Sequence, residues 1–257
     1  MGCNLRCRHC QNWELSRSSC QNVSLRDISP YQLTNTALKT NSKGISWTYN
    51  EPSIWFEYVI ESAKIAKDNN LYTVMVTNGF IREKPLSELL NYIDVYRVDI
   101  KAFTQKTFKL ITGLSKVEIP LVSALQAKEC GNHVEIVTNI ITTINDTEDE
   151  LRSIATFISE KLGEKTPWHI TRFFPYLDFS YLPPTPFPLL VRAKEIGKEC
   201  GIDFVYMGNA RESLEQNTIC PRCGSVAIRR AGFEVYKVDI TEKGDCKSCG
   251  EFLNIYP

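Results

Sequence analysis

Short apolar runs rich in β-branched and aromatic residues alternate along this chain with longer segments in which apolar residues recur every three to four positions. The short runs predict strands and the longer segments predict helices. Such alternation is typical of a parallel sheet with helices packed outside it, so we expect an α/β fold. The predicted strands are residues 44–49, 71–77, 94–100, 133–141, 168–174 and 202–208, and the predicted helices are 52–70, 85–93, a stretch within 104–130, 147–163 and 187–201.

The alternation stops near residue 215, and the rest of the chain carries two Cys-x-x-Cys pairs, CPRCG and CKSCG, separated by a strand-like stretch. This spacing predicts a zinc ribbon in which four thiolates hold one ion. A second iron-sulfur cluster is the main alternative, because thiolate spacing does not distinguish iron from zinc, and four ordinary buried cysteines are the other. The predicted ligands are Cys220, Cys223, Cys246 and Cys249. We therefore expect two domains, residues 1–214 and residues 215–257.

Composition excludes several classes of protein. Thirty basic and thirty acidic residues leave no net charge, which gives no indication of binding to nucleic acid or to an anionic membrane. No apolar run approaches the ~20 residues of a membrane span, and the polar, cysteine-rich start is unlike a signal peptide. Eight of the ten cysteines fall in close groups, which favours metal thiolates in a reducing compartment over disulfides. We expect a cytoplasmic protein.

Three cysteines, Cys3, Cys7 and Cys10, are gathered in the opening GCNLRCRHC. Three thiolates on a 4Fe-4S cluster leave one iron without a protein ligand, and such an open position lets a metal centre bind a substrate or cofactor directly. The alternative is a zinc site of three thiolates completed by His9 or Cys20. Within the iron interpretation, His9 packs beside the cluster and Cys20 takes no part.

The spacing Cys-x-x-x-Cys-x-x-Cys resembles the signature of the radical S-adenosylmethionine (SAM) enzymes. WTYNEPS (47–53) is similar to the family's Gly-Gly-Glu-Pro element, with Tyr49 and Asn50 where two glycines are usual. VTNGF (76–80) and VDIKAF (98–103) resemble segments of the pyruvate formate-lyase-activating enzymes. The resemblance implies that these elements bind SAM, its amino group at Asn50 and Glu51, and its carboxylate and ribose at Thr77, Asn78, Asp99 and Lys101. A plain ion pair between Asp99 and Lys101 is the alternative for that pair.

Two further candidates lie on later strands. Asn139 occupies a position where relatives often carry a polar residue toward the cofactor. In HITRFF, His169 shares a strand face with Thr171 and Phe173, which makes His169 a candidate for the substrate side of the barrel, while a satisfied core histidine is an equal alternative.

Taken over nearly the full length, the motifs most resemble the radical SAM member of the AmmeMemoRadiSam system, which is close to the pyruvate formate-lyase-activating enzymes. The resemblance implies a partial (β/α)6 barrel and an oxidoreductase that uses a 4Fe-4S cluster to cleave SAM reductively. The resulting 5′-deoxyadenosyl radical would take a hydrogen atom from a substrate that the motifs do not identify. An electron donor such as flavodoxin or ferredoxin, and companion proteins of the Memo and AMMECR types, are implied as partners, with Zn²⁺ expected in the ribbon.

In the family a barrel strand leads into the cysteine loop, whereas here only Met1 and Gly2 precede Cys3. We therefore expect a barrel without its first strand and a true start upstream. The competing hypothesis is a degenerate, amino-terminally truncated module that binds metal and partners without radical chemistry. Formation of 5′-deoxyadenosine distinguishes the two.

Overall fold

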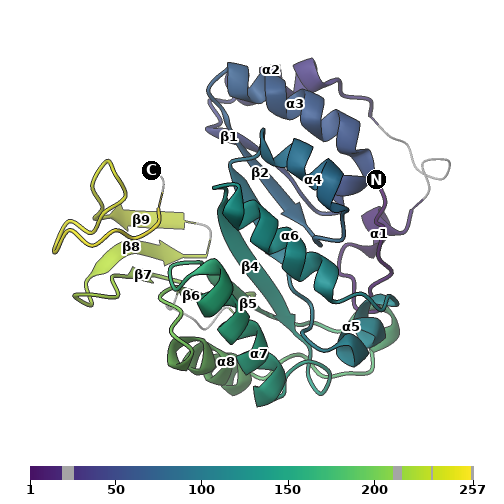
Figure 1. The fold of residues 1–257 in the computed structure, drawn as a ribbon, viewed down its shortest axis with the longest axis vertical. Coiled ribbons are helices and arrows are strands. Elements are labelled where there is room, and N and C mark those ends of the chain that lie inside the picture. The colour runs from purple at the N-terminus through teal and green to yellow at the C-terminus, as the bar shows by residue number, and fades with distance from the viewer. Residues whose placement is uncertain (19–25, 211–215, 233, 256–257) are drawn as a thin grey trace. The chain divides into compact units, whose positions relative to one another are not determined.

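The computed structural model describes residues 1–18, 26–210, 216–232 and 234–255 (Figure 1). Cys20 and the predicted domain boundary near residue 215 lie outside this part of the chain. The structure divides into two compact units, the first formed by residues 1–135 and 174–182 and the second by residues 136–173 and 183–257. Each unit is described by itself.

All six predicted strands are present, and they form a parallel sheet in the order β1 to β6. The α/β prediction is confirmed, and the partial-barrel form stays a prediction. The strands are β1 (Gly44–Trp47), β2 (Tyr72–Thr77), β3 (Val95–Asp99), β4 (His133–Ile140), β5 (Trp168–Arg172) and β6 (Val205–Gly208).

Helices follow the strands where the pattern predicted them, with different bounds. The segment predicted over 52–70 is a 3-10 turn, η1 (Pro52–Trp55), followed by α3 (Phe56–Asp68), and the segment over 104–130 is two helices, because Gly113 ends the first in a left-handed conformation. The two helices within 104–130 are α5 (Gln105–Thr112) and α6 (Glu118–Glu129). The other helical elements after the strands are α4 (Glu83–Leu90), α7 (Glu148–Phe157) with the π-helical turn η2 (Ile158–Leu162), the 3-10 turn η3 (Leu177–Phe179) and α8 (Phe187–Glu199).

Two helices were not predicted, α1 (Trp13–Ser16) and α2 (Pro30–Lys39). A complete capping box starts α2, since Ser29 and Gln32 each bond the other's backbone N–H. Its buried residues are only Thr34 and Ala37, so the apolar stripe that would reveal the helix is weak.

Burial alternates strictly along β4, whose even-numbered residues are buried and whose odd-numbered residues are half-buried. The buried side of the strands carries the core, including Met75, Tyr96, Ile136 and Trp168. The other side is more polar, with Arg97 paired to Glu135 at 3.2 Å and Asn139 further along β4. One face of the sheet therefore holds the fold together, and the other is open to polar chemistry.

The carboxyl-terminal residues form a separate three-stranded antiparallel sheet within the second unit, consisting of β7 (Thr218–Ile219), β8 (Val226–Ala231) and β9 (Glu234–Val238). Its core contains Cys220, Cys246, Ile240 and Leu253, and Phe204, which directly precedes β6, belongs to the same cluster. The small sheet thus shares its core with the last strand of the large one.

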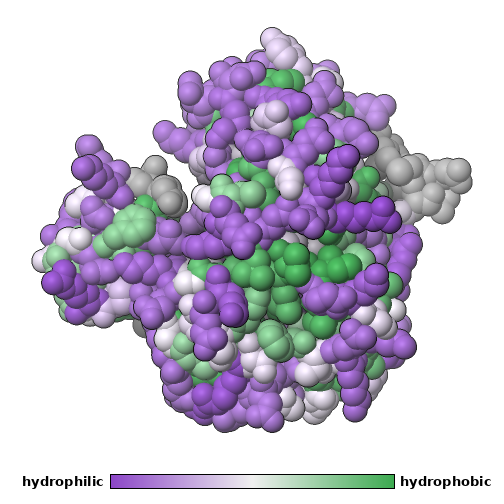
Figure 2. Space-filling view, viewed as in Figure 1, coloured by the Kyte–Doolittle hydropathy of each residue, from purple (hydrophilic) through white to green (hydrophobic). Residues whose placement is uncertain are grey.

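None of the helices in the described part of the chain has the length and apolar character that a bilayer crossing requires. Polar and charged side chains make up most of the face drawn in Figure 2.

Candidate functional site

The cysteine loop, residues 3–10, is fastened to the end of α5. Leu5 is buried in the core, and the backbone N–H groups of Arg6 and Arg8 donate to the carbonyls of Thr112 (3.3 Å) and Ile111 (2.9 Å). The loop then turns, because Cys10 N–H lies 3.4 Å from the Cys7 carbonyl. All three loop cysteines are partly buried thiols, and no cysteine in the described ranges forms a disulfide.

The three thiols act on one another electrostatically. Burial is the main cause that raises the pKa of Cys7 to about 11; the Lys101 ammonium opposes the rise, and charges on Cys3 and Cys10 contribute to it. Burial also raises the pKa of Cys3. Cys7 feels the charges of both other thiols, so all three would need a bound cation to stay ionised together, because like charges in a low-dielectric site repel. This donor set therefore fits an iron-sulfur cluster with three protein ligands.

Residues 174–182 pack against this loop and belong to the same unit; we call them the strap. Phe179 is fully buried, donates its backbone N–H to the Arg8 carbonyl (3.3 Å) and stacks on the His9 ring at 6.3 Å. The Arg8 guanidinium lies over the Phe179 ring and pairs with Asp178 at 3.2 Å. The strap thus shields the side of the loop that carries His9 from water.

His9 should make the protein acid-sensitive. Burial, assisted by Lys101, lowers the pKa of His9 to about 3, whereas an unfolded histidine titrates near 6.5. Between these values only the unfolded chain takes up the proton, so stability falls as the pH falls below ~6.5. Between pH 7 and pH 5, the unfolding free energy of wild-type protein should fall by about 2 kcal/mol more than that of His9→Phe. Urea denaturation at each pH measures both changes. An equal fall in the unfolding free energy of both proteins would show that His9 also accepts a proton in the folded state.

Glu51 is buried at the carboxyl ends of β1 and β2, with 1 % of its surface exposed. Its carboxylate accepts from the backbone N–H of Ser53 (3.0 Å), the hydroxyl of Thr77 (2.6 Å) and the backbone N–H of Asn78 (2.8 Å). Burial raises the pKa of Glu51, and these hydrogen bonds work against the rise. The sequence singled out all three of Glu51, Thr77 and Asn78, and the structure joins them.

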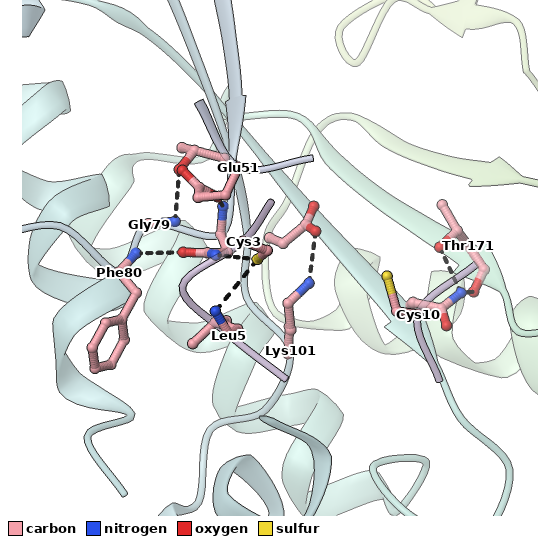
Figure 3. A network of polar contacts seen from close by, with 12 residues as sticks. Cys3, Leu5, Cys10, Glu51, Gly79, Phe80, Lys101 and Thr171 are labelled. Atoms are coloured by element: carbon pink, nitrogen blue, oxygen red, sulfur yellow. Dashed lines mark hydrogen bonds and ion pairs between the residues drawn. The ribbon is translucent and has the colours of Figure 1, made fainter. Parts of the chain in front are cut away.

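Asn78 connects this carboxylate to the cysteine loop. Figure 3 shows Glu51 and Cys3 within the same network of polar contacts. Its side-chain amide donates to Cys3 Sγ (3.5 Å) and to Asn4 Oδ1 (2.8 Å), and its Oδ1 accepts from Phe80 N–H (2.8 Å). Gly79 follows with φ +69°, and a Cβ there would lie 2.6 Å from Val98, so the TNGF turn requires glycine.

Tyr49 stands where the family usually has glycine, and its φ of 72° lies in the left-handed region. A tyrosine in this conformation costs free energy, about 1–2 kcal/mol, that a glycine would not. The turn that presents Asn50 and Glu51 therefore has at Tyr49 a conformation that glycine adopts more readily. Asn50 itself is half-buried.

Asp99 and Lys101 lie at the end of β3 and form an ion pair of 2.7 Å. Burial alone would lower the pKa of Lys101, but Asp99, Cys7 and Cys3 together raise it above its usual value. Lys101 is therefore a fixed positive charge that acts on Cys7 and Cys3. Figure 3 shows Lys101 and Cys3 together.

Asn139 and His169 belong to the second unit. The Asn139 side chain donates to the carbonyl (3.2 Å) and hydroxyl (3.0 Å) of Thr171 on β5. His169 stacks on Tyr206 of β6 at 5.3 Å, and the Tyr206 hydroxyl lies 2.9 Å from that of Thr218 in β7. The roles predicted for Asn139 and His169 stay predictions.

The four ribbon cysteines converge, with all sulfur atoms within 4.8 Å of one another. The Cys220–Cys249 and Cys223–Cys246 sulfurs are 3.6 and 3.8 Å apart, against about 3.8 Å expected between thiolates around zinc at 2.3 Å. Gly224 and Gly250 take positive φ and donate to the carbonyls of Cys220 and Cys246. Hydrogen bonding from Ser225 lowers the pKa of Cys246 to about 6. Against a hydrogen bond from the Glu251 backbone, burial and the neighbouring thiols raise the pKa of Cys249 to about 12, so the thiols of the group ionise unequally. The group fits a tetrahedral metal site, whose ion the geometry does not identify.

Sequence reasoning missed three contacts of the site. Asn4, which bonds Asn78 and the Phe80 carbonyl, lies within the cysteine motif at a position that the motif leaves variable. Asp178 pairs with a residue 170 positions away, which no local pattern reveals. Ser16, 3.2 Å from Cys10 Sγ, is buried on α1, a helix too short to predict.

A parallel α/β sheet, a three-thiol loop near its strand ends and a four-thiol group together suit metal binding. Residues 1–158 match the model of the Radical SAM superfamily, and the chain belongs to this family. The family uses SAM, a 4Fe-4S cluster and an electron donor.

Three known proteins are similar to this chain in sequence or in fold. The chain is 36 % identical over 259 residues to the uncharacterized protein MJ0808 of Methanocaldococcus jannaschii, covering 99 % of this chain and 75 % of that protein. It is 26 % identical to the pyruvate formate-lyase-activating enzyme of Clostridium pasteurianum, over 65 % of this chain and 72 % of that enzyme. The structure of Streptococcus suis SuiB bound to S-adenosylmethionine matches with a TM-score of 0.63 at 13 % identity, over 81 % of this chain and 48 % of SuiB, a likeness of fold alone.

Proposed function

We propose that this chain is a radical SAM oxidoreductase of the activating-enzyme type, with Cys3, Cys7 and Cys10 as the protein ligands of a 4Fe-4S cluster. When bound, the cluster supplies the electron for reductive cleavage of SAM to methionine and a 5′-deoxyadenosyl radical, which takes a hydrogen atom from a substrate. One observation carries the proposal: Asn78 bonds both Cys3 and Glu51, so the predicted ligand loop and the predicted SAM-binding residues form one network.

The chain's own residues bind and orient SAM beside the loop. Lys101 offers a fixed positive charge to the SAM carboxylate, and Asp99, which neutralises part of that charge, has further acceptor capacity for a ribose hydroxyl. Glu51 accepts three protein hydrogen bonds, and a carboxylate has about four acceptor positions. The remaining position suits the SAM ammonium, with Asn50 next to it. Thr77 and Asn78 fix the Glu51 carboxylate, and Asn139 and His169 are assigned to the cofactor and substrate side.

The substrate is proposed only by class, as a donor of a hydrogen atom. Similarity to a pyruvate formate-lyase-activating enzyme supports a partner protein as that donor. A flavodoxin or ferredoxin is the proposed source of the electron, and the ribbon is assigned a structural Zn²⁺. The motif combination along the chain supports Memo-like and AMMECR-like companions, a pairing that co-purification would test.

The decisive experiment is anaerobic reconstitution of the full chain with iron and sulfide, followed by dithionite and SAM. We expect a brown protein with cluster absorbance that forms 5′-deoxyadenosine and methionine in equal amounts, since each cleavage releases one of each. A colourless protein with divalent metal in the cysteine loop, or a brown one that leaves SAM intact, would contradict the proposal. The second outcome would favour a metal-binding module without radical chemistry.

A further inference from the structure

The short helix α1 folds back over the cysteine loop that precedes it. The backbone N–H of Gly2 donates to the Leu15 carbonyl (3.0 Å), and the Arg17 guanidinium donates to the Cys7 carbonyl (2.9 Å). These bonds fasten α1 to the start and to the middle of the loop. The side chains of α1 that face the loop are therefore held close to the thiols.

Ser16, the last residue of α1, is such a side chain. Its hydroxyl oxygen lies 3.2 Å from Cys10 Sγ, and the residue is 7 % exposed. Helical serines commonly donate to the carbonyl four positions earlier, as Ser62 does to Tyr58 (2.6 Å) and Ser153 to Asp149 (2.7 Å) in this chain. At Ser16 the corresponding Asn12 carbonyl accepts the backbone N–H, and the hydroxyl faces sulfur instead.

The direction of this hydrogen bond depends on the state of Cys10. With a thiol either atom can donate, but a metal-bound thiolate has no proton and can only accept. With Cys10 as a cluster ligand, the Ser16 hydroxyl is therefore the donor. Cys3 has comparable donors, the Leu5 N–H at 3.4 Å and the Asn78 amide at 3.5 Å.

We propose that Ser16 is a positioning residue that donates a hydrogen bond to the Cys10 thiolate and makes the cluster easier to reduce. This inference rests on the proposed function. Reduction adds negative charge to the cluster and its sulfur ligands, so a donor aimed at sulfur stabilises the reduced form more than the oxidised form. The hydrogen bond is buried, where less water competes for the hydroxyl. Ser16 thus helps to determine which electron donors can reduce this enzyme.

The test compares two nearly isosteric replacements, Ser16→Thr and Ser16→Val, which differ in the hydroxyl. Full-length, cluster-loaded proteins are titrated anaerobically, and the reduced cluster is followed by electron paramagnetic resonance. We expect a more negative midpoint potential in the valine protein than in the threonine protein, which should stay near wild type. Ser18→Ala is the matched control, because the Ser18 hydroxyl donates to the Glu14 carbonyl and not to sulfur; it should leave the potential unchanged.

The outcomes separate this inference from the proposed function. Equal potentials in the threonine and valine proteins, at equal iron content, would overturn the role of Ser16 and leave the proposed function standing. Loss of the cluster in the valine protein but not in the threonine protein would support the hydroxyl as a contact of Cys10. Loss of the cluster in both proteins would overturn the proposal, because the threonine hydroxyl would then fail to preserve the cluster. A wild-type protein with no iron-sulfur signal would overturn the inference and the proposed function together.

Discussion

Cys7→Ala is expected to reduce 5′-deoxyadenosine formation to background while the protein remains folded. Removal of one of three thiolates leaves two iron corners without a protein ligand, and such a cluster is not retained. The fold should tolerate the change because the loop is anchored by buried Leu5 and by the backbone bonds of Arg6 and Arg8 to the end of α5. Iron content, cluster absorbance and 5′-deoxyadenosine are measured together, with circular dichroism to check folding.

Cys130→Ala is the matched control, since Cys130 is an exposed thiol at the end of α6. It should retain the iron content and the activity of wild-type protein. If Cys7→Ala kept its 5′-deoxyadenosine formation, the assignment of the loop as the cluster ligand would fail.

Cys246→Ala should have the largest effect on stability. Cys246 is buried in the ribbon core together with Cys220, Ile240 and Leu253, and loss of one of four thiolates should release the metal. We expect the loss of metal to cost several kcal/mol, roughly 3 or more, because metal binding at such sites contributes directly to folding free energy. Metal analysis and denaturant unfolding of the purified chain measure both effects.

The same variant should loosen one strand of the large sheet. Phe204 lies in the ribbon core and Tyr206 of β6 packs against it, so amide hydrogen exchange should accelerate in β6. Exchange in β1 to β3, which lie in the other unit, should change little. Cys200→Ala at the end of α8 is the control and should keep its metal. Unchanged metal content in Cys246→Ala would show that the four-thiol group is not a metal site, and unchanged β6 exchange would show that the ribbon is energetically independent.

The strands of this fold could be predicted because each is a short apolar run bounded by polar residues or glycine. Helix α2 could not be found by periodicity, since its buried side consists of Thr34 and Ala37. Its capping box was nevertheless legible as Ser29 followed three positions later by Gln32. Local capping chemistry would have located a helix that hydrophobic patterning missed.

At the site, short motifs identified the residues but not their contacts. Glu51 was predicted as a ligand for an ammonium, and the structure adds that it also holds Thr77 and Asn78 in place. That contact depends on the pairing of β1 with β2, which places the two strand ends side by side. Asp178 reaches the loop only through the folded chain, so its pairing with Arg8 had no signal in the sequence.

The contact of Arg8 with Asp178 spans 170 positions of the chain. At synthesis rates of about 5–20 residues per second, the cysteine loop leaves the ribosome on the order of ten seconds before the strap exists to pack against it. During that interval the nascent chain presents three uncovered sulfurs to oxygen and stray metal ions. Cells that make this protein would have to install its cofactor late, or guard those thiols until translation has passed the strap.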